Sequence, residues 1–404
     1  MAALAKPVLP APTPLGPAHS GKADAEILNL TLGAEQDPAT AHTPSHTLGS
    51  DAELLPKLVS PLAWSGADFA TDDGYTYVLT NDEVLEVENG LRYFRSLDEL
   101  GHAIEPATFP LPTLNSKLKL LRDELFKGRG FINIRGIDPD KFSPEDNVLV
   151  FLGISKYMGT RVGKQDLEGY MLGHIRDSAE SQVDQEQRPF RDSRLPLTFH
   201  TDSYTDILGM QTRGLAASGG GHLIVSTWRI YNELLQERPD VLKLLLTPDW
   251  PVEDRGHLEN GERRAVMFIE DGKVQMNFVR YLLLGRPGIE RPSSLPQCTR
   301  EQVEALDVLE ATALKHQLRL NMQYGDMTYV NNLAILHSRE AFENDESHVR
   351  HLVRIWLRNE QLAWRTPRVL DRGFDMVFGD DVPEKWNIVP QPRLNFNIFQ
   401  TLGP

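Results

Sequence analysis

Residues 196–202 read PLTFHTD, an apolar approach to a histidine and an aspartate that stand two positions apart. The approach predicts a strand, and side chains two apart on a strand point to the same side of a sheet. Residues 326–339 read DMTYVNNLAILHSR, a second strand-forming run, which delivers His337. We therefore expect His200, Asp202 and His337 to meet at one place in the folded chain.

Further strands, separated by glycine-rich turns, fill the middle and the end of the chain. The predicted strands cover residues 195–201, 207–211, 223–226, 266–269, 274–278, 327–331, 333–338 and 351–357. Helical periodicity is found at residues 114–125, 144–157, 228–246 and 300–318. This pattern predicts a mainly β fold with flanking helices, a β-sandwich or jelly roll.

The first part of the chain has a different composition. Residues 1–60 are rich in Ala, Pro, Thr, Ser and Gly, so turn formers interrupt every apolar period. We expect these residues to form a disordered tail, and residues 61–404 to form a single jelly-roll domain with helical inserts.

Charge and composition exclude several classes of protein. The 404 residues carry a formal net charge of -15, which disfavours nucleic acid and anionic membranes as partners. No apolar run approaches the roughly 18 residues that cross a bilayer, and no secretory signal opens the sequence, so a cytoplasmic location is expected. Because Cys298 is the single cysteine, the chain has no internal disulfide and no metal site made of thiolates. A homo-oligomer is compatible with the sequence.

Any metal must therefore bind imidazole and carboxylate groups. Two histidines and one carboxylate form the facial triad of non-haem iron oxygenases, which leaves coordination positions for a chelating 2-oxo acid and O₂. Other interpretations remain open: a strand-end His and Asp that bond to backbone, a zinc hydrolase with the same three ligands, and a catalytically inactive metal-binding jelly roll.

Two arginines follow the third histidine. Residues 350–357 read RHLVRIWL, a predicted strand on which Arg350 and Arg354 share a face. A guanidinium grips a carboxylate through two parallel hydrogen bonds, although solvated surface arginines are the alternative. Tyr204 and Asn277 stand near strand ends, where they line a substrate cavity or simply bond to backbone.

The order of these residues resembles a known family. The set His200-x-Asp202, His337 and Arg350-x-x-x-Arg354, with Ser218-Gly219-Gly220 between, is similar to the taurine and chlorophenoxyacetate dioxygenases over residues 110–365. Residues 170–177 and 360–364, YMLGHIRD and EQLAW, resemble a fungal branch of it. The resemblance implies a clavaminate synthase-like jelly roll, the double-stranded β-helix.

The resemblance also implies roles for individual residues. It makes His200, Asp202 and His337 ligands of Fe(II), and Arg350 the partner of the distal carboxylate of the cosubstrate 2-oxoglutarate. His222 stands where the family tends to place a Thr or Ser that helps to hold this cosubstrate, and an imidazole is bulkier there than a hydroxyl.

The implied substrate is a small molecule. The position of Arg354 meets the acidic group of the substrate in several relatives, so we expect a small carboxylate such as an amino acid or a specialised-metabolite intermediate. The implied reaction is O₂-dependent hydroxylation, desaturation or cyclisation. Tyr204 and Asn277 complete the predicted substrate residues.

Overall fold

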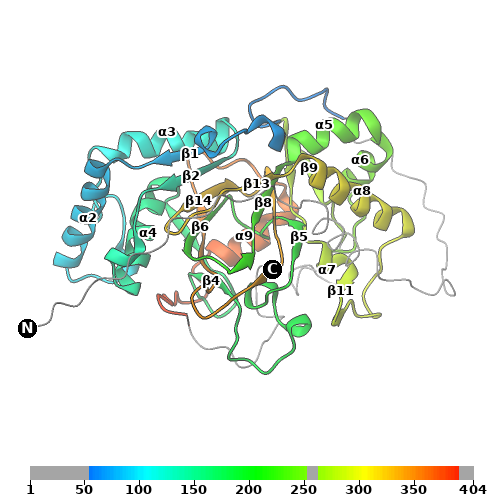
Figure 1. The fold of residues 1–404 in the computed structure, drawn as a ribbon. Coiled ribbons are helices and arrows are strands. Elements are labelled where there is room, and N and C mark those ends of the chain that lie inside the picture. Colours follow the sequence, from blue (N-terminus) through cyan, green and yellow to red (C-terminus); the bar gives the residue numbers. More distant parts are fainter. Residues whose placement is uncertain (1–53, 253–262, 391–404) are drawn as a thin grey trace, which may run out of the picture. The chain divides into compact units, whose positions relative to one another are not determined.

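The computed structural model describes residues 54–252 and 263–390, which belong to one unit, Gly49–Pro404 (Figure 1). Two sheets organise it. The larger sheet has the order β1 (Thr76–Val78), β2 (Phe131–Arg135), β14 (Met327–Asn331), β6 (Ile207–Gly214), β17 (His351–Arg358) and β3 (Arg161–Gly163), and β4 (Gly173–Arg176) also pairs with β17. The smaller sheet has the order β13 (Leu318–Arg319), β8 (His222–Ser226), β15 (Ile335–Arg339) and β5 (Leu197–His200).

Nearly all of the strand pairs are antiparallel, and only β1 with β2 is parallel among the described residues. Each of the eight predicted strands overlaps an observed one, and β14 has the predicted bounds. The remaining strands are short pairs: β7 (Ser218–Gly219) with β16 (Phe342–Glu343), β9 (Met267–Glu270) with β10 (Lys273–Met276), and β11 (Gly285–Arg286) with β12 (Ile289–Glu290). The predicted mainly β architecture with flanking helices is confirmed.

Helices flank the sheets in two groups (Figure 1). The first comprises α2 (Asn81–Ser96), α3 (Leu114–Lys127) and α4 (Pro144–Met158), which contact one another. Helix α4 begins as its sequence predicts, because the Ser143 side chain accepts a hydrogen bond from the Asp146 amide at 3.0 Å and Pro144 occupies the first turn. Helix α2 was not predicted from the sequence.

The second group comprises α5 (Thr227–Glu237), α6 (Pro239–Leu246) and α8 (Arg300–His316), which cover the smaller sheet. The prediction of one helix over residues 228–246 is wrong. Proline has no amide hydrogen and its ring collides with the preceding turn, so the chain breaks at Arg238 and Pro239 starts a new helix. Two short helices, α7 (Arg280–Leu284) and α9 (Asp371–Phe378), were also not predicted.

Two hydrophobic clusters fill the interior. The larger sheet packs with α2, α3 and α4, and fully buried Phe151, Tyr329 and Trp356 lie in that cluster. The smaller sheet packs with α5, α6 and α8. The site described below lies where the two sheets meet, since Asp202 is contacted by His337 of the smaller sheet and by Arg354 and Trp356 of the larger one. No helix in the described part of the chain is long and apolar enough to cross a membrane.

The expected tail is partly outside the described residues, which begin at Leu54. Residues 54–60 are described and lie against α5: the Leu58 amide donates to Asn232 Oδ1 at 2.7 Å, and the Tyr231 hydroxyl donates to the Leu55 carbonyl at 2.8 Å. Leu54, Leu55 and Leu58 bury part of their apolar surface against the second cluster, so we propose that the domain begins a few residues before the expected boundary at residue 60.

Candidate metal centre

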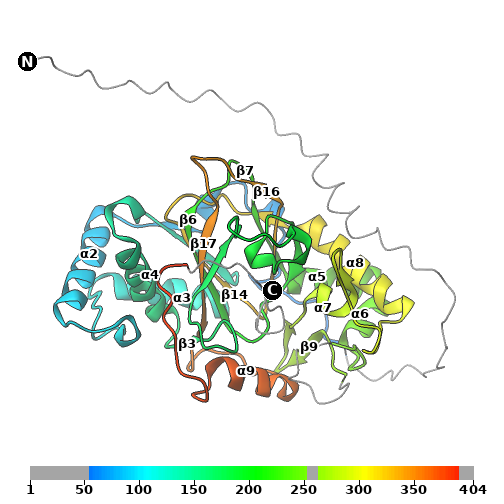
Figure 2. The same cartoon turned by 90° about the horizontal axis from the view of Figure 1, so that it is seen from below.

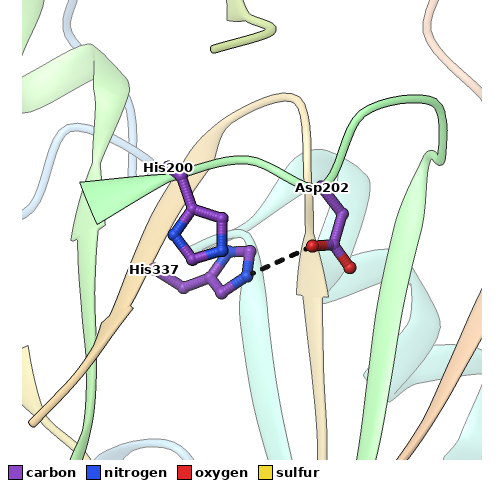
Figure 3. Close-up of side chains that lie close together, drawn as sticks. All are labelled: His200, Asp202 and His337. Carbon is purple, nitrogen blue, oxygen red and sulfur yellow. Dashed lines mark ion pairs between the residues drawn. The ribbon is translucent and has the colours of Figure 1, made fainter. Parts of the chain in front are cut away.

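Three predicted ligands converge between the sheets (Figure 3). His200 ends β5, His337 lies in the neighbouring strand β15, and the two residues are paired directly across the strands. One potential ligand atom from each of His200, Asp202 and His337 lies within 4.8 Å of the others, and all three side chains are buried. His337 Nε2 is 3.7 Å from Asp202 Oδ1.

Asp202 reaches this point by a different route from the predicted one. The strand ends at His200, so Asp202 lies in the following turn rather than on the strand. Asn332 holds the turn: its Oδ1 accepts from the Asp202 amide and its Nδ2 donates to the Asp202 carbonyl, both at 2.8 Å. The turn, and not the strand alternation, aims this carboxylate at the histidines.

The larger sheet fixes the orientation of the same carboxylate. Arg354 Nη1 on β17 lies 3.2 Å from Asp202 Oδ2, and the Trp356 indole also donates to this oxygen. The His200 ring is oriented from its other side, since Nδ1 donates to the Thr198 carbonyl at 2.8 Å. That hydrogen bond leaves Nε2 as the nitrogen with a free lone pair.

The protonation states suit metal binding. Burial, followed by the charge of His337, lowers the pKa of His200 well below its usual value. Burial alone would raise the pKa of Asp202, but Arg354 and His337 outweigh it and hold that pKa below its usual range. A neutral imidazole and an ionised carboxylate are the forms that bind a cation, so His200 and Asp202 fit an iron ion.

Arg350 is linked to the metal centre through His222, since its charge acts on that ring, which lies 6.0 Å from the ring of His337. It is buried, its Nε donates to the Gly220 carbonyl at 3.1 Å, and its guanidinium lies 5.3 Å from the centre of the Phe342 ring. Gly220 has φ of 70°, and a Cβ there would lie 2.8 Å from Arg350 Cδ. Gly220 of the sequence motif therefore makes room for this arginine.

His222 lies close to both His337 and Arg350. Its ring centre is 6.0 Å from that of His337, and neither ring nitrogen has a hydrogen-bond partner among the described residues. Burial, followed by the charges of His337 and Arg350, lowers the pKa of His222 well below its usual value. The imidazole is therefore neutral, with one donor and one acceptor available to a ligand.

The predicted substrate residues do not all lie together. Tyr204 packs edge-on against Phe374 of α9, with 6.1 Å between ring centres, in the larger hydrophobic cluster. Asn277 Oδ1 accepts from Arg264 at 2.7 Å and its Nδ2 donates to the Ser203 carbonyl. Both side chains therefore stabilise the fold through these contacts. Whether they also contact a substrate stays a prediction.

Arg339 was missed by the sequence analysis. It is buried on β15, two residues beyond His337 and paired across the strands with His222. Burial and the like charge of Arg350 lower its pKa well below the usual arginine value. The alternation along the predicted strand at His337 was a signal for it, because residues 337 and 339 must share a face.

A buried carboxyl behind β5 gives a stability prediction. Glu310 of α8 is buried, accepts from the Phe199 amide at 3.4 Å, and burial raises its pKa to about 7. Because the folded-state pKa lies above the ordinary glutamate value of 4.5, the folded form is favoured at low pH and loses stability as the pH rises through 7. We expect a loss of about 3 kcal/mol between pH 5 and pH 8 that Glu310→Gln removes.

Thermal or denaturant unfolding of both proteins across this pH range measures the difference between them. Glu304→Gln on the exposed side of the same helix is the control, and it should leave the pH profile of the wild type unchanged. Parallel profiles for the wild type and Glu310→Gln would show that the carboxyl does not titrate in this range.

Fold and donor set together define a class of protein. Two histidines and one carboxylate, set between two antiparallel sheets with no cysteine nearby, are the metal site of mononuclear non-haem iron oxygenases. Residues 96–356 match the model of the taurine catabolism dioxygenase TauD, TfdA family, and the chain belongs to this family. It is an iron- and 2-oxoglutarate-dependent oxygenase.

Individual relatives agree with the family assignment. The chain is 32% identical over 377 residues to the taurine hydroxylase-like protein SAT17 of Stachybotrys chartarum (strain CBS 109288 / IBT 7711), covering 87% of this chain and 97% of the relative. The predicted resemblance to the taurine dioxygenases, including a fungal relative, is confirmed.

Solved structures establish the jelly-roll fold. An asparagine oxygenase in complex with Fe(II), 2S,3S-3-hydroxyasparagine and succinate has a TM-score of 0.54 at 16% identity, covering 70% of this chain and 93% of that one. The non-haem iron oxygenase OrfP in complex with Fe and alpha-ketoglutaric acid also has a TM-score of 0.54 at 16% identity, covering 70% and 94%. The predicted fold class is confirmed.

Proposed function

We propose that this oxygenase holds Fe(II) with His200, Asp202 and His337 and oxidises a small acidic molecule, such as an amino acid or a specialised-metabolite intermediate. The observation that carries the proposal is the convergence of these three buried side chains within 4.8 Å. Iron bound there would supply the oxidising chemistry, in which O₂ and 2-oxoglutarate are consumed and succinate and CO₂ are released. The outcome for the substrate is hydroxylation, desaturation or cyclisation.

The remaining steps belong to the protein. Arg350 and His222 would bind and orient the cosubstrate beside the metal, and the two hydrophobic clusters would keep water from the reacting groups. Asn332, Arg354 and Trp356 would hold Asp202 in one orientation while the substrate enters. Loss of such a contact to a metal ligand typically costs about 10- to 100-fold in metal affinity or activity.

The experiment is a succinate-release assay. The purified protein with Fe(II), ascorbate and 2-oxoglutarate is offered a panel of amino acids and other small carboxylates, and succinate and the modified substrate are measured. Release above the background without substrate supports the oxygenase with an acidic substrate. Activity with Zn²⁺ in place of iron, without consumption of 2-oxoglutarate, would instead identify a hydrolase, and binding of iron with no turnover on any compound would identify an inactive metal-binding jelly roll.

Arg354 is our candidate for the acidic end of the substrate. Its Nε donates to Gln165 Oε1 at 2.8 Å and its Nη1 contacts Asp202, while its buried Nη2 has no hydrogen-bond partner among the described residues. An open donor beside the metal ligand supports a role in gripping a substrate carboxylate.

We predict that Arg354→Lys raises the substrate KM by about tenfold or more, since an ammonium cannot bridge Asp202, Gln165 and a substrate at once. The KM for 2-oxoglutarate should change little, because Arg350 is assigned to that ligand. A substrate KM equal to that of the wild type would mean that Arg354 serves Asp202 alone.

The cellular setting is also a proposal. We infer a cytoplasmic enzyme without nucleic acid or membrane partners, and the support is the net charge of -15. Oligomerisation is left open. Size-exclusion chromatography and fractionation of cells that express the protein test both points.

A further inference from the structure

A second buried arginine stands beside the one assigned to the cosubstrate. The guanidinium carbons of Arg339 and Arg350 each lie 5.3 Å from the centre of the Phe342 ring, so one aromatic ring touches both cations. Both side chains are about 95% buried. Neither forms an ion pair with a residue in the described ranges 54–252 and 263–390.

Acidic groups nearby are already engaged. Asp177, whose charge reaches Arg339, forms ion pairs with Arg188 at 2.9 Å and Arg194 at 3.4 Å. Asp202 belongs to the candidate metal centre and to Arg354. Two like charges buried near each other without a counter-ion destabilise the folded protein. Binding of an anion next to the two guanidinium groups would offset this destabilisation.

Arg339, Arg350 and His222 have buried nitrogens without a hydrogen-bond partner in the described part of the chain, and these nitrogens indicate where an anion would bind. Arg350 Nη1, Arg339 Nε and both ring nitrogens of His222 are buried without a hydrogen-bond partner among the described residues. His222 is the direct cross-strand partner of Arg339, and Arg350 bonds to the Gly220 carbonyl two residues before His222. The charge of Arg350 acts on both His222 and Arg339, and the His222 ring lies 6.0 Å from that of His337, so these donors belong to neighbouring residues close to the candidate metal centre.

We propose that Arg339 and Arg350 form a two-arginine site for the distal carboxylate of 2-oxoglutarate, with His222 completing its wall. The inference rests on the proposed function and adds a residue to it. Part of the role of Arg339 is structural, because its two terminal nitrogens donate to the carbonyls of Phe190 and Leu195. Its charge and its Nε make the pocket select a cosubstrate with an anionic end.

The test compares two ligands that differ only at that end. 2-Oxopentanoate has the same carbon chain as 2-oxoglutarate and carries a methyl group in place of the distal carboxylate. Binding of each to the Fe(II)-loaded protein is measured by calorimetry without O₂, so that no turnover is needed. We expect Arg339→Gln to weaken 2-oxoglutarate by about tenfold while 2-oxopentanoate is unchanged.

Arg319→Gln is the matched control, because Arg319 lies exposed on β13, the other neighbour of β8 in the smaller sheet, and pairs with Glu340. It should leave both affinities as in the wild type. If Arg339→Gln lowers the affinity for both ligands equally, or for neither, Arg339 only anchors residues 190–195 through its hydrogen bonds and the inference is wrong. If the wild type itself binds neither ligand with Fe(II), the proposed function fails instead.

A second measurement does not depend on the stability of the Arg339 variant. In Arg350→Ala, a two-arginine site keeps a preference of about tenfold for 2-oxoglutarate over 2-oxopentanoate, because Arg339 still supplies positive charge. Equal affinities for the two ligands in this variant would show that Arg350 acts alone.

Discussion

Asp202→Ala and His200→Ala should each abolish iron binding and 2-oxoglutarate-dependent succinate release, with a loss of more than about a hundredfold. Removal of a mere outer contact of a metal ligand already costs about 10- to 100-fold, and these substitutions remove the ligand itself. Both side chains are buried, so water cannot fill the vacated position as freely as at a surface. The measurements are iron content after dialysis against Fe(II) and the rate of succinate formation.

A surface pair of the same residue types is the control. His348 and Asp345 lie 3.0 Å apart and are exposed, so His348→Ala and Asp345→Ala should leave iron content and rate unchanged. Asp202→Ala also removes the buried ion-pair partner of Arg354. The thermal unfolding of the Asp202→Ala variant must therefore be compared with that of His200→Ala. Retention of one bound iron per chain in both folded variants would refute the assignment of these ligands.

The histidines could be found from the sequence because strand alternation is a local property. Residues 335–339 and 197–200 are apolar, β-prone runs, and a histidine at a fixed position in each must point to one side of its sheet. Their direct pairing across the strands then follows from the antiparallel register. The mainly β fold was predictable for the same reason, since eight such runs recur along the chain.

Other parts of the site depend on contacts between distant segments. Asp202 leaves the strand and is held by Asn332, which lies 130 positions away, and no periodicity encodes that bond. Arg354 contacts Gln165 and Asp202, two residues that belong to separate loops facing β17. Arg339 was predictable in principle from alternation, but its burial depends on Phe342 and on the segment around Phe190.

Arg350→Ala should raise the dissociation constant of 2-oxoglutarate by about a hundredfold while the protein still binds iron. The side chain is buried and Nη1 has no hydrogen-bond partner among the described residues, so it is ready to bind a carboxylate. Loss of one member of a buried, hydrogen-bonded charge pair costs about 2–5 kcal/mol, which corresponds to at least a 30-fold change in affinity. Calorimetric titration of 2-oxoglutarate into the iron-loaded variant measures this change.

Arg350→Lys separates charge from shape. Lysine keeps the positive charge but loses the fork that bonds the Gly220 carbonyl and a carboxylate together, so we expect a dissociation constant between those of the wild type and Arg350→Ala. If the affinity for 2-oxoglutarate were unchanged in both variants, another cation would have to bind its distal carboxylate. Arg354 could not then take both roles, because its Nη1 and Nε are already committed to Asp202 and Gln165, and Arg339 would become the principal carboxylate partner.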